Sequence, residues 1–570
     1  MAEVVTALAQ AARNEPLSAI VSRLRYQAAV HSEVPLSRWL KTDTSSNRER
    51  ADALRWQVGP VSLDASKQQL DLSTLELLLE WVELCGLDHQ RSALFAGKPI
   101  NLSERRPALH MALRWPTGEL SPAGSELAVE AAQSQKAKMA TLVERIRSGD
   151  WQGATGKPIR HLIHIGVGGS DLGPRLASQA LAEDCQQGSI DVHFVSCMDG
   201  GQLLPLMRTL DPAATLVVVA SKSFGTVDTL FNLRTALTWV SDGVGLDEQS
   251  VCQHQLLGVS TRPDRMAEFG IPIEHQLEFE AWVGGRFSLW STIGVSLAVQ
   301  IGMPAFQALL DGAHAMDRHF LEAPAHDNLP VLTAVIGAWN SQFLEIPTHA
   351  VLPYDSRLAL LPSYLQQLEM ESNGKSCSRE GSPVESRTCP ILWGDLDPNA
   401  QHTFYQLLHQ GSHTVSADLL AVTGRYQDED GYMRERLQDQ KRLTLANCLA
   451  QSQLLALGDQ AIPSSLRGHL AQGFSGNHPH SLLLMERLSP YSLGVLLALY
   501  EHKVFVQSLL WNLKSFDQPG VELGKRLAES VYRRLWGAQA EAAKMVDDLS
   551  VCGLLTQQLS SLCDGVAESR

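Results

Sequence analysis

The chain has 570 residues, of which 44% are hydrophobic and 19% charged, a composition typical of a globular protein with more than one core. Its net charge of −15 and the lack of a run of Lys and Arg argue against a surface that binds nucleic acid. The nine cysteines form no Cys-x-x-Cys pair, which fits a reducing compartment and offers no zinc framework.

The N-terminus carries no basic region before its apolar residues, so it does not indicate a signal peptide. The longest apolar stretches, residues 331–339 and 493–500, are too short to span a bilayer. We therefore expect a cytoplasmic protein with no membrane and no nucleic-acid partner.

The pattern of elements changes along the chain. Residues 1–150 are mostly helix and loop, with helical spacing of apolar positions over 70–87. Short apolar runs then alternate with helical patterns, which predicts a parallel sheet covered on both faces. The predicted strands of this first unit are residues 161–165, 192–196, 215–220 and 256–260.

A second unit of the same kind begins near residue 331. Its predicted strands are 349–352, 390–393 and 419–422, and the helices between them are 358–370 and 402–409. The residues after 522 are predicted as helix to the end, apart from short breaks. The chain is thus expected to carry two doubly wound α/β units of unequal size.

The first glycine-rich turn, residues 166–173, follows a predicted strand and opens a helix, where backbone N–H groups attract an anion. A dinucleotide fingerprint needs a third glycine, and that position holds Asp171. By itself this turn favours helix capping by Ser170 or Asp171.

A second turn, Ser221-Lys222-Ser223-Phe224-Gly225-Thr226, places three hydroxyls and a lysine where a strand passes into a helix. One helix cap does not need three hydroxyls, so the pattern favours a phosphate over capping.

Arg286 lies between glycines and apolar residues, where an arginine is usually paired with a carboxylate. Its guanidinium could instead stabilise negative charge on a substrate oxygen.

The stretch 366–376 ends in Gly374-Lys375-Ser376, like a nucleotide-binding loop, but Glu369 stands where that loop requires glycine. The alternative is a helix end that delivers a carboxylate base, Glu369 or Glu371. Further along, His402 is placed at the start of a helix, where it would stay neutral and able to exchange a proton. Lys525 falls in the second turn of a helix after Pro519-Gly520, where a solvated surface lysine is the ordinary interpretation.

Together these stretches resemble the glucose-6-phosphate isomerase (phosphoglucose isomerase) family, bacterial type. They occur in the family's order, and the Gly-Gly-Arg-Phe-Ser and Phe-Asp-Gln-x-Gly-Val-Glu-x-x-Lys stretches are highly specific. The stretches that carry the resemblance are 165–174, 221–224, 283–290, 370–375, 401–411 and 515–525.

The resemblance implies an aldose–ketose isomerase of D-glucose 6-phosphate and D-fructose 6-phosphate that needs no cofactor and no metal. Glu371 would move a proton between carbons 1 and 2, and Arg286 would stabilise the enediolate. His402, from the neighbouring subunit of a homodimer, and Lys525 would serve ring opening. The implied substrate-binding residues are Gly169, Ser170, Ser221, Lys222, Ser223, Thr226, Gln367 and Gln518.

The resemblance also implies two sugar-isomerase (SIS) domains of the α/β/α type. The expected division is a helical segment over 1–130, a small domain over 131–305, a large domain over 306–525 and a helical segment over 526–570. The sequence departs from the family pattern at Ser223, Gly225, Asp228 and Ala400. The alternatives are a non-enzymatic sugar-phosphate-binding protein, which would lack the base, the arginine or the lysine, and a nucleotide-dependent enzyme, for which each glycine turn lacks a required glycine.

Overall fold

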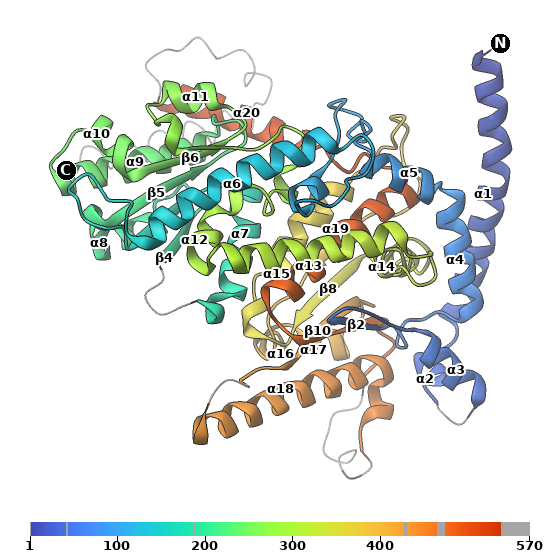
Figure 1. The fold of residues 1–570 in the computed structure, drawn as a ribbon. Coiled ribbons are helices and arrows are strands. Elements are labelled where there is room, and N and C mark those ends of the chain that lie inside the picture. Colours follow the sequence, from blue (N-terminus) through green and yellow to red (C-terminus); the bar gives the residue numbers. More distant parts are fainter. Residues whose placement is uncertain are drawn as a thin grey trace. The chain divides into compact units, whose positions relative to one another are not determined.

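The computed structural model describes residues 2–536, apart from 42–43, 186–189, 427–429, 464 and 466–472. It forms two compact units, Met1–Phe516 and Asp517–Arg570, and each is treated by itself. The first unit contains all the strands that the structure describes, arranged as two sheets (Figure 1). In the second unit the described residues form one helix, α20 (Pro519–Trp536).

The first sheet has five parallel strands in the order β4-β3-β5-β6-β7. Its central strand, β5, is buried at all six positions, and alternate side chains enter two different hydrophobic clusters. The apolar pattern predicted four of these strands, but not β7, whose three residues include only one apolar side chain, Leu277. The bounds are β3 (His161–Ile165), β4 (Asp191–Val195), β5 (Thr215–Ala220), β6 (Leu256–Ser260) and β7 (Gln276–Glu278).

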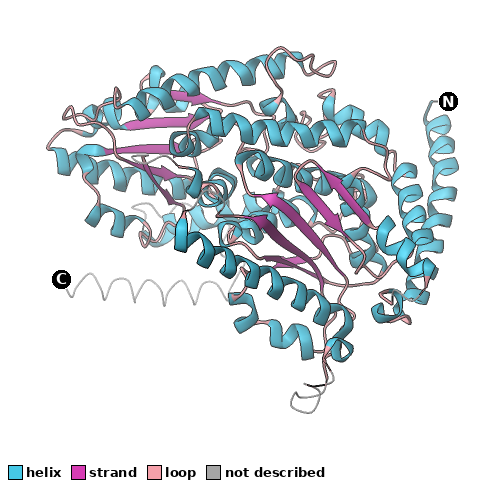
Figure 2. Cartoon of the chain, turned by 60° about the horizontal axis from the view of Figure 1, so that its bottom comes forward, coloured by secondary structure: helices cyan, strands magenta, loops and turns pink. Residues whose placement is uncertain are grey.

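Helices cover both faces of this sheet, as the continuous apolar strands require (Figure 2). α9 and α10 contribute to the cluster on one face, and α6, α7 and α12 contribute to the other. The helices around the sheet are α6 (Glu126–Ser148), α7 (Leu172–Ala180), α8 (Leu203–Thr209), α9 (Val227–Val244), α10 (Glu248–Gln255), α11 (Pro263–Glu268) and α12 (Val295–Ile301).

The second sheet has six strands in the order β1-β2-β11-β10-β8-β9. Its four strands from the second half of the chain are parallel, and β2 joins β11 antiparallel. The hairpin β1–β2 therefore brings the N-terminal segment into this sheet, which the sequence did not predict because each strand has only four residues. β11 was also missed. The bounds are β1 (Arg55–Val58), β2 (Val61–Asp64), β8 (Thr348–Pro353), β9 (Ile391–Trp393), β10 (Ser416–Gly424) and β11 (His480–Arg487).

The remaining helices belong to the N-terminal segment or surround the second sheet. The predicted helix over 70–87 is present as α4, whose N-cap Asp71 accepts a hydrogen bond from the Thr74 N–H at 2.8 Å. The bounds are α1 (Ala2–Ser32), α2 (Leu36–Trp39), α3 (Ser45–Ala53), α4 (Leu72–Leu84), α5 (Leu87–Phe95), α13 (Met303–Glu322), α14 (Leu329–Ala338), α15 (Leu361–Leu365), α16 (Asn399–Thr403), α17 (Tyr405–Gln410), α18 (Gly431–Leu457) and α19 (Pro490–Leu510).

Helix α19 is the central helix of the first unit. It packs against α13 and α14, and a capping box between Ser489 and Ser492 starts it. Among the described residues it is the one helix whose length and hydropathy would suit a membrane span, but that segment is completely buried inside the fold. It is therefore a core helix, longer than the apolar stretch in the sequence had suggested.

Two predicted helices differ from expectation. The helix expected over 358–370 is divided into α15 and a π-helical turn, η10 (Gln366–Glu371). The helix expected over 402–409 is two short helices, α16 and α17, and His402 lies in the last turn of α16. The predicted placement of His402 at the start of a single helix over 402–409 is therefore wrong.

Candidate active site

The first glycine-rich turn lies against the segment that carries Arg286. A Cβ atom at Gly169 would lie 2.1 Å from the carbonyl oxygen of Gly285, so only glycine permits this approach. The Ser288 hydroxyl also donates a hydrogen bond to the Gly169 carbonyl at 3.1 Å. Backbone contact thus places the turn after β3 beside the arginine.

Neither predicted cap of α7 is formed by this turn. Asp171 is the N-cap residue, but its side chain makes no capping hydrogen bond and instead pairs with Arg175 at 3.1 Å. Burial raises the pKa of Asp171 to about 6, although Arg175 opposes this. The expectation that the turn serves helix capping is wrong, and Ser170 remains beside Gly169 in the same turn.

The second turn, residues 221–226, is shaped by a buried aromatic side chain. Phe224 has a φ of 43°, uncommon for a residue other than glycine, and its ring packs edge-on against Phe269 at 5.8 Å. Thr226 is the N-cap residue of α9 without a side-chain capping bond, and its hydroxyl lies 3.3 Å from that of Ser221. Since Thr226 does not cap the helix, its hydroxyl suits a ligand.

Lys222 connects this second turn with the segment before Arg286. Its Nζ donates hydrogen bonds to the carbonyls of Ala281 at 2.9 Å and Val283 at 2.6 Å. An ammonium group has three donors, so one can still reach an anion. Burial is the main cause that lowers the pKa of Lys222 to about 8, and the nearby Arg106 and Arg286 lower it further.

Arg286 is 4% exposed and held from several sides. Its Nε donates to the Ser372 hydroxyl at 2.7 Å, and one Nη donates to the Ser515 carbonyl at 2.5 Å. The other Nη lies 3.2 Å from a carboxylate oxygen of Glu371. The carboxylate pair expected for an arginine in an apolar stretch is therefore present, and its partner is the predicted base.

Glu371 ends the π-helical turn η10, and Gln367 lies in the same turn. A Cβ atom at Gly168 would lie 3.1 Å from the amide nitrogen of Gln367, so this side chain reaches the first glycine-rich turn. π-Helical turns are rare and occur frequently at functional sites. A carboxylate beside a fixed guanidinium can accept a proton from carbon while the cation stabilises the charge that develops on oxygen.

Sequence reasoning missed the partner of Glu369. This carboxylate is 1% exposed and accepts hydrogen bonds from Nζ of Lys503, on α19, at 2.8 and 3.0 Å. Removing one partner of such a buried pair costs about 3–5 kcal/mol, whereas an exposed pair contributes less than about 1 kcal/mol. The signal in the sequence was the charged triplet Glu501-His502-Lys503 inside an otherwise apolar helix.

Three further predicted residues lie on other elements. His402 is exposed on α16. Gln518 and Lys525 belong to the second unit, where Gln518 precedes α20 and Lys525 is exposed on it. Their roles stay predictions.

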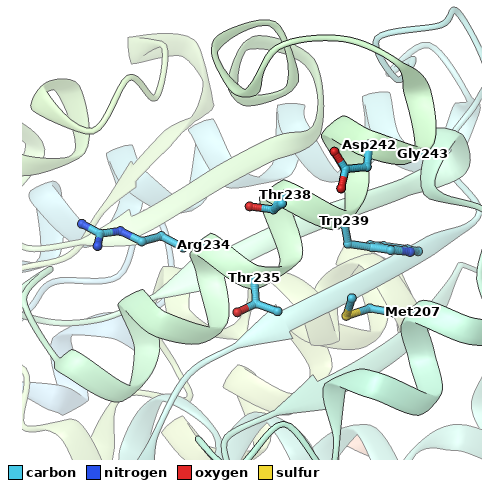
Figure 3. Close-up of a pocket in the computed structure, with 7 residues that line it drawn as sticks. All are labelled: Met207, Arg234, Thr235, Thr238, Trp239, Asp242 and Gly243. Carbon is cyan, nitrogen blue, oxygen red and sulfur yellow. The ribbon is translucent and has the colours of Figure 1, made fainter. Parts of the chain in front are cut away.

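A surface hollow elsewhere shares no residue with this group. It lies between α8 and α9 and is lined by Met207, Arg234, Thr235, Thr238, Trp239, Asp242 and Gly243 (Figure 3). Within the described ranges, no cluster of three His, Cys, Asp or Glu residues could hold a metal ion. The chemistry therefore points to the Arg286–Glu371 region and not to the hollow.

Known proteins are similar to this chain over most of its length. The sequence model of a family described as Phosphoglucose isomerase matches residues 64–554. Glucose-6-phosphate isomerase 2 of Chromohalobacter salexigens is 48% identical over 502 residues, which cover 86% of this chain and 89% of that protein. Glucose-6-phosphate isomerase of Psychrobacter cryohalolentis is 46% identical over 516 residues, which cover 89% of this chain and 92% of that protein.

A solved structure is similar over nearly the whole chain. The crystal structure of a glucose-6-phosphate isomerase from Chlamydia trachomatis superposes with a TM-score of 0.79 at 32% sequence identity, covering 94% of this chain and 98% of that one. On the length of the family match and the identity of its relatives, this chain belongs to the phosphoglucose isomerase family.

Proposed function

We propose that this protein catalyses the reversible isomerisation of D-glucose 6-phosphate and D-fructose 6-phosphate through an enediolate intermediate. Family membership supports the substrate and the reaction. The observation that carries the proposal is the Arg286–Glu371 pair, with 3.2 Å between guanidinium and carboxylate. An aldose–ketose isomerisation needs a base over both carbons and a cation beside the oxygens, and this pair supplies both.

In the proposed mechanism Glu371 removes the proton from carbon 2 and returns it to carbon 1, while Arg286 stabilises the enediolate. Lys222 and the hydroxyls of turn 221–226 hold the phosphate, together with Ser170 of the first glycine-rich turn. Gly169 and Gln367 line the site, as does Gln518. Ring opening requires an acid and a base at the sugar oxygens, and His402 with Lys525 takes this role.

His402 belongs, in this proposal, to the active site of the neighbouring subunit in a homodimer. Its exposed position on α16 supports a contact outside its own chain. The proposed location is the cytoplasm, which fits cysteines that form no Cys-x-x-Cys pair and a reducing compartment. We also propose the domain division of 131–305 and 306–525. Its support is that the parallel strands of the two sheets fall in 161–278 and 348–487, while 1–130 adds a hairpin to the second sheet.

The direct test is turnover of fructose 6-phosphate by the purified protein in a coupled assay. Glu371→Gln removes the base but keeps the shape of the side chain, so we expect kcat to fall by at least about a thousandfold while the sugar phosphate still binds. Binding without turnover by the unaltered protein would identify a sugar-phosphate-binding protein instead. Near-normal turnover by the variant would reject Glu371 as the base.

The shared active site is tested by mixing two inactive variants. His402→Ala and Glu371→Gln are each nearly inactive as homodimers, but a mixed dimer holds one site with both residues intact. We expect activity to appear after subunit exchange and to approach about a quarter of the unaltered value, because half of the dimers are mixed and each has one intact site. Continued inactivity of a mixed dimer, isolated with two different affinity tags, would place His402 in the site of its own subunit.

A further inference from the structure

The core helix α19 carries three consecutive ionisable residues that the proposed mechanism does not use. Glu501, His502 and Lys503 are 1%, 0% and 4% exposed. A buried charge is costly unless it is paired and hydrogen-bonded. The partner of Lys503 is Glu369, which accepts hydrogen bonds with both carboxylate oxygens.

The environment keeps Lys503 charged. Burial lowers the pKa of Lys503, but the carboxylates of Glu369 and Asp418 outweigh it, so the pKa lies above its ordinary value. Asp418 in turn accepts a hydrogen bond from the Tyr500 hydroxyl at 3.0 Å and lies 3.3 Å from the His349 ring. The ammonium group therefore faces two carboxylates, and the pair with Glu369 is ionic.

The contact with Lys503 fixes one end of the segment that carries the base. Glu369 stands two residues before Glu371 in the π-helical turn η10. On the other side of Glu371, the Asn373 amide donates to the carbonyl of Val504 at 2.9 Å, one residue further along α19. Glu371 therefore lies between two residues, Glu369 and Asn373, whose side chains both bond to α19.

Stability alone does not explain an ionic contact here. A well-packed apolar pair often stabilises a core as much as a buried ion pair does, whereas an ion pair with hydrogen bonds fixes distance and direction. A π-helical turn is rare and short, so contacts from outside the turn are needed to hold it in one position. Orientation of the base at this point therefore gives a physical reason for the two charges.

We propose that Lys503 and Glu369 are positioning residues that orient the Glu371 carboxylate for proton transfer at carbon. The pair touches no substrate and acts through the backbone of the π-helical turn. This inference rests on the proposed function, because it assumes that Glu371 is the base.

The test is the double variant Glu369→Gln/Lys503→Met, which removes both charges and leaves neither alone in the core. The matched control is Asp211→Asn/Lys157→Met, which likewise changes a carboxylate to its amide and a lysine to methionine, in an exposed ion pair of 2.9 Å. A base displaced by a fraction of an ångström loses rate, so we expect kcat to fall about 10–100-fold with KM changed less than about threefold. The control should retain the activity of the unaltered protein.

A second readout separates positioning from loss of folded protein. With glucose 6-phosphate deuterated at carbon 2, a misplaced base makes proton transfer slower, so the isotope effect on kcat should increase. Partial unfolding lowers kcat without changing the isotope effect. An unchanged kcat, or a lower kcat with an unchanged isotope effect, would overturn the inference.

A milder variant covers the case in which the double variant does not fold. Glu369→Asp keeps the charge and shortens the side chain by one methylene, so we expect a smaller fall in kcat with the same increase in isotope effect. The absence of that increase would reject the inference. Lack of turnover by the unaltered protein would instead reject the proposed function, so the two failures are distinguishable.

Discussion

The reacting end of the candidate site and its phosphate turn are built in different ways. At the reacting end, Arg286 is buried and bonded to Ser372, Ser515 and Glu371, and the segment that carries Glu371 is tied to α19. In turn 221–226, Ser223 is exposed and Thr226 half-buried, and the two hydroxyls of Ser221 and Thr226 contact only weakly at 3.3 Å.

The difference follows from what each region must do. A cation that stabilises developing charge acts best when it is fixed before the reaction, since no rearrangement is then needed in the transition state. A phosphate brings its own strong acceptors, so the donors of the turn need not be firmly bonded to one another before it binds. Changes at the reacting end should therefore lower kcat, and changes in the phosphate turn should raise KM.

The largest effect is expected for Arg286→Lys. The lysine keeps the positive charge but loses the planar fork that bonds Ser372, Ser515 and Glu371 together. We expect kcat to fall about 10²–10³-fold, the range for loss of a group that stabilises an oxyanion, with a small change in KM. Steady-state kinetics with a melting curve as control will measure this. A change confined to KM would remove the distinction between the two regions.

An intermediate effect is expected for Gly169→Ala, which disturbs the contact between the first glycine-rich turn and the Arg286 segment. The new Cβ would lie 2.1 Å from the Gly285 carbonyl oxygen, so the two backbones must separate. We expect kcat/KM to fall about 10–100-fold, because a displacement near 1 Å can cost that much.

The matched control for this change is Gly285→Ala, on the other side of the same contact. A Cβ atom there meets nothing within 4 Å, so the melting temperature should stay the same. Equal losses of stability in the two variants would show that the close approach of Gly169 does not hold the segments together.

The smallest effect concerns the charge of Lys222 and sharpens the description of the phosphate turn. Its pKa is lowered to about 8, so below pH 8 the ammonium is charged and above pH 8 it is progressively neutral. If it binds phosphate, kcat/KM should fall with rising pH, by about tenfold for each unit above the pKa. Lys222→Arg stays charged over this range and should remove that alkaline decline. A decline that persists in this variant would assign it to another group.

Much of the fold was readable from the sequence because it depends on local pattern. The strand 215–220 was predicted with its observed bounds, since Thr215 is followed by five consecutive apolar residues and this run leaves little alternative. The pairing of Arg286 with a carboxylate was also expected, because an arginine in an apolar stretch needs one. The hairpin β1–β2, by contrast, is stabilised by β11, more than 400 residues later, and short strands carry no periodicity of their own.

The sequence by itself determined the two α/β units, the hydroxyl-rich turn and the two candidate carboxylates, Glu369 and Glu371, through residue types in particular orders. Only the tertiary structure decided that Glu369 is buried and paired with Lys503, and that Lys222 donates hydrogen bonds to the segment before Arg286. It also decided that Glu371 ends a π-helical turn. The physical reason is that side-chain chemistry is local, whereas burial and ion pairing depend on which distant segments the core brings together. For Glu369 and Glu371, two residues apart, only the three-dimensional contacts separate a carboxylate paired with Lys503 in the core from a carboxylate paired with Arg286.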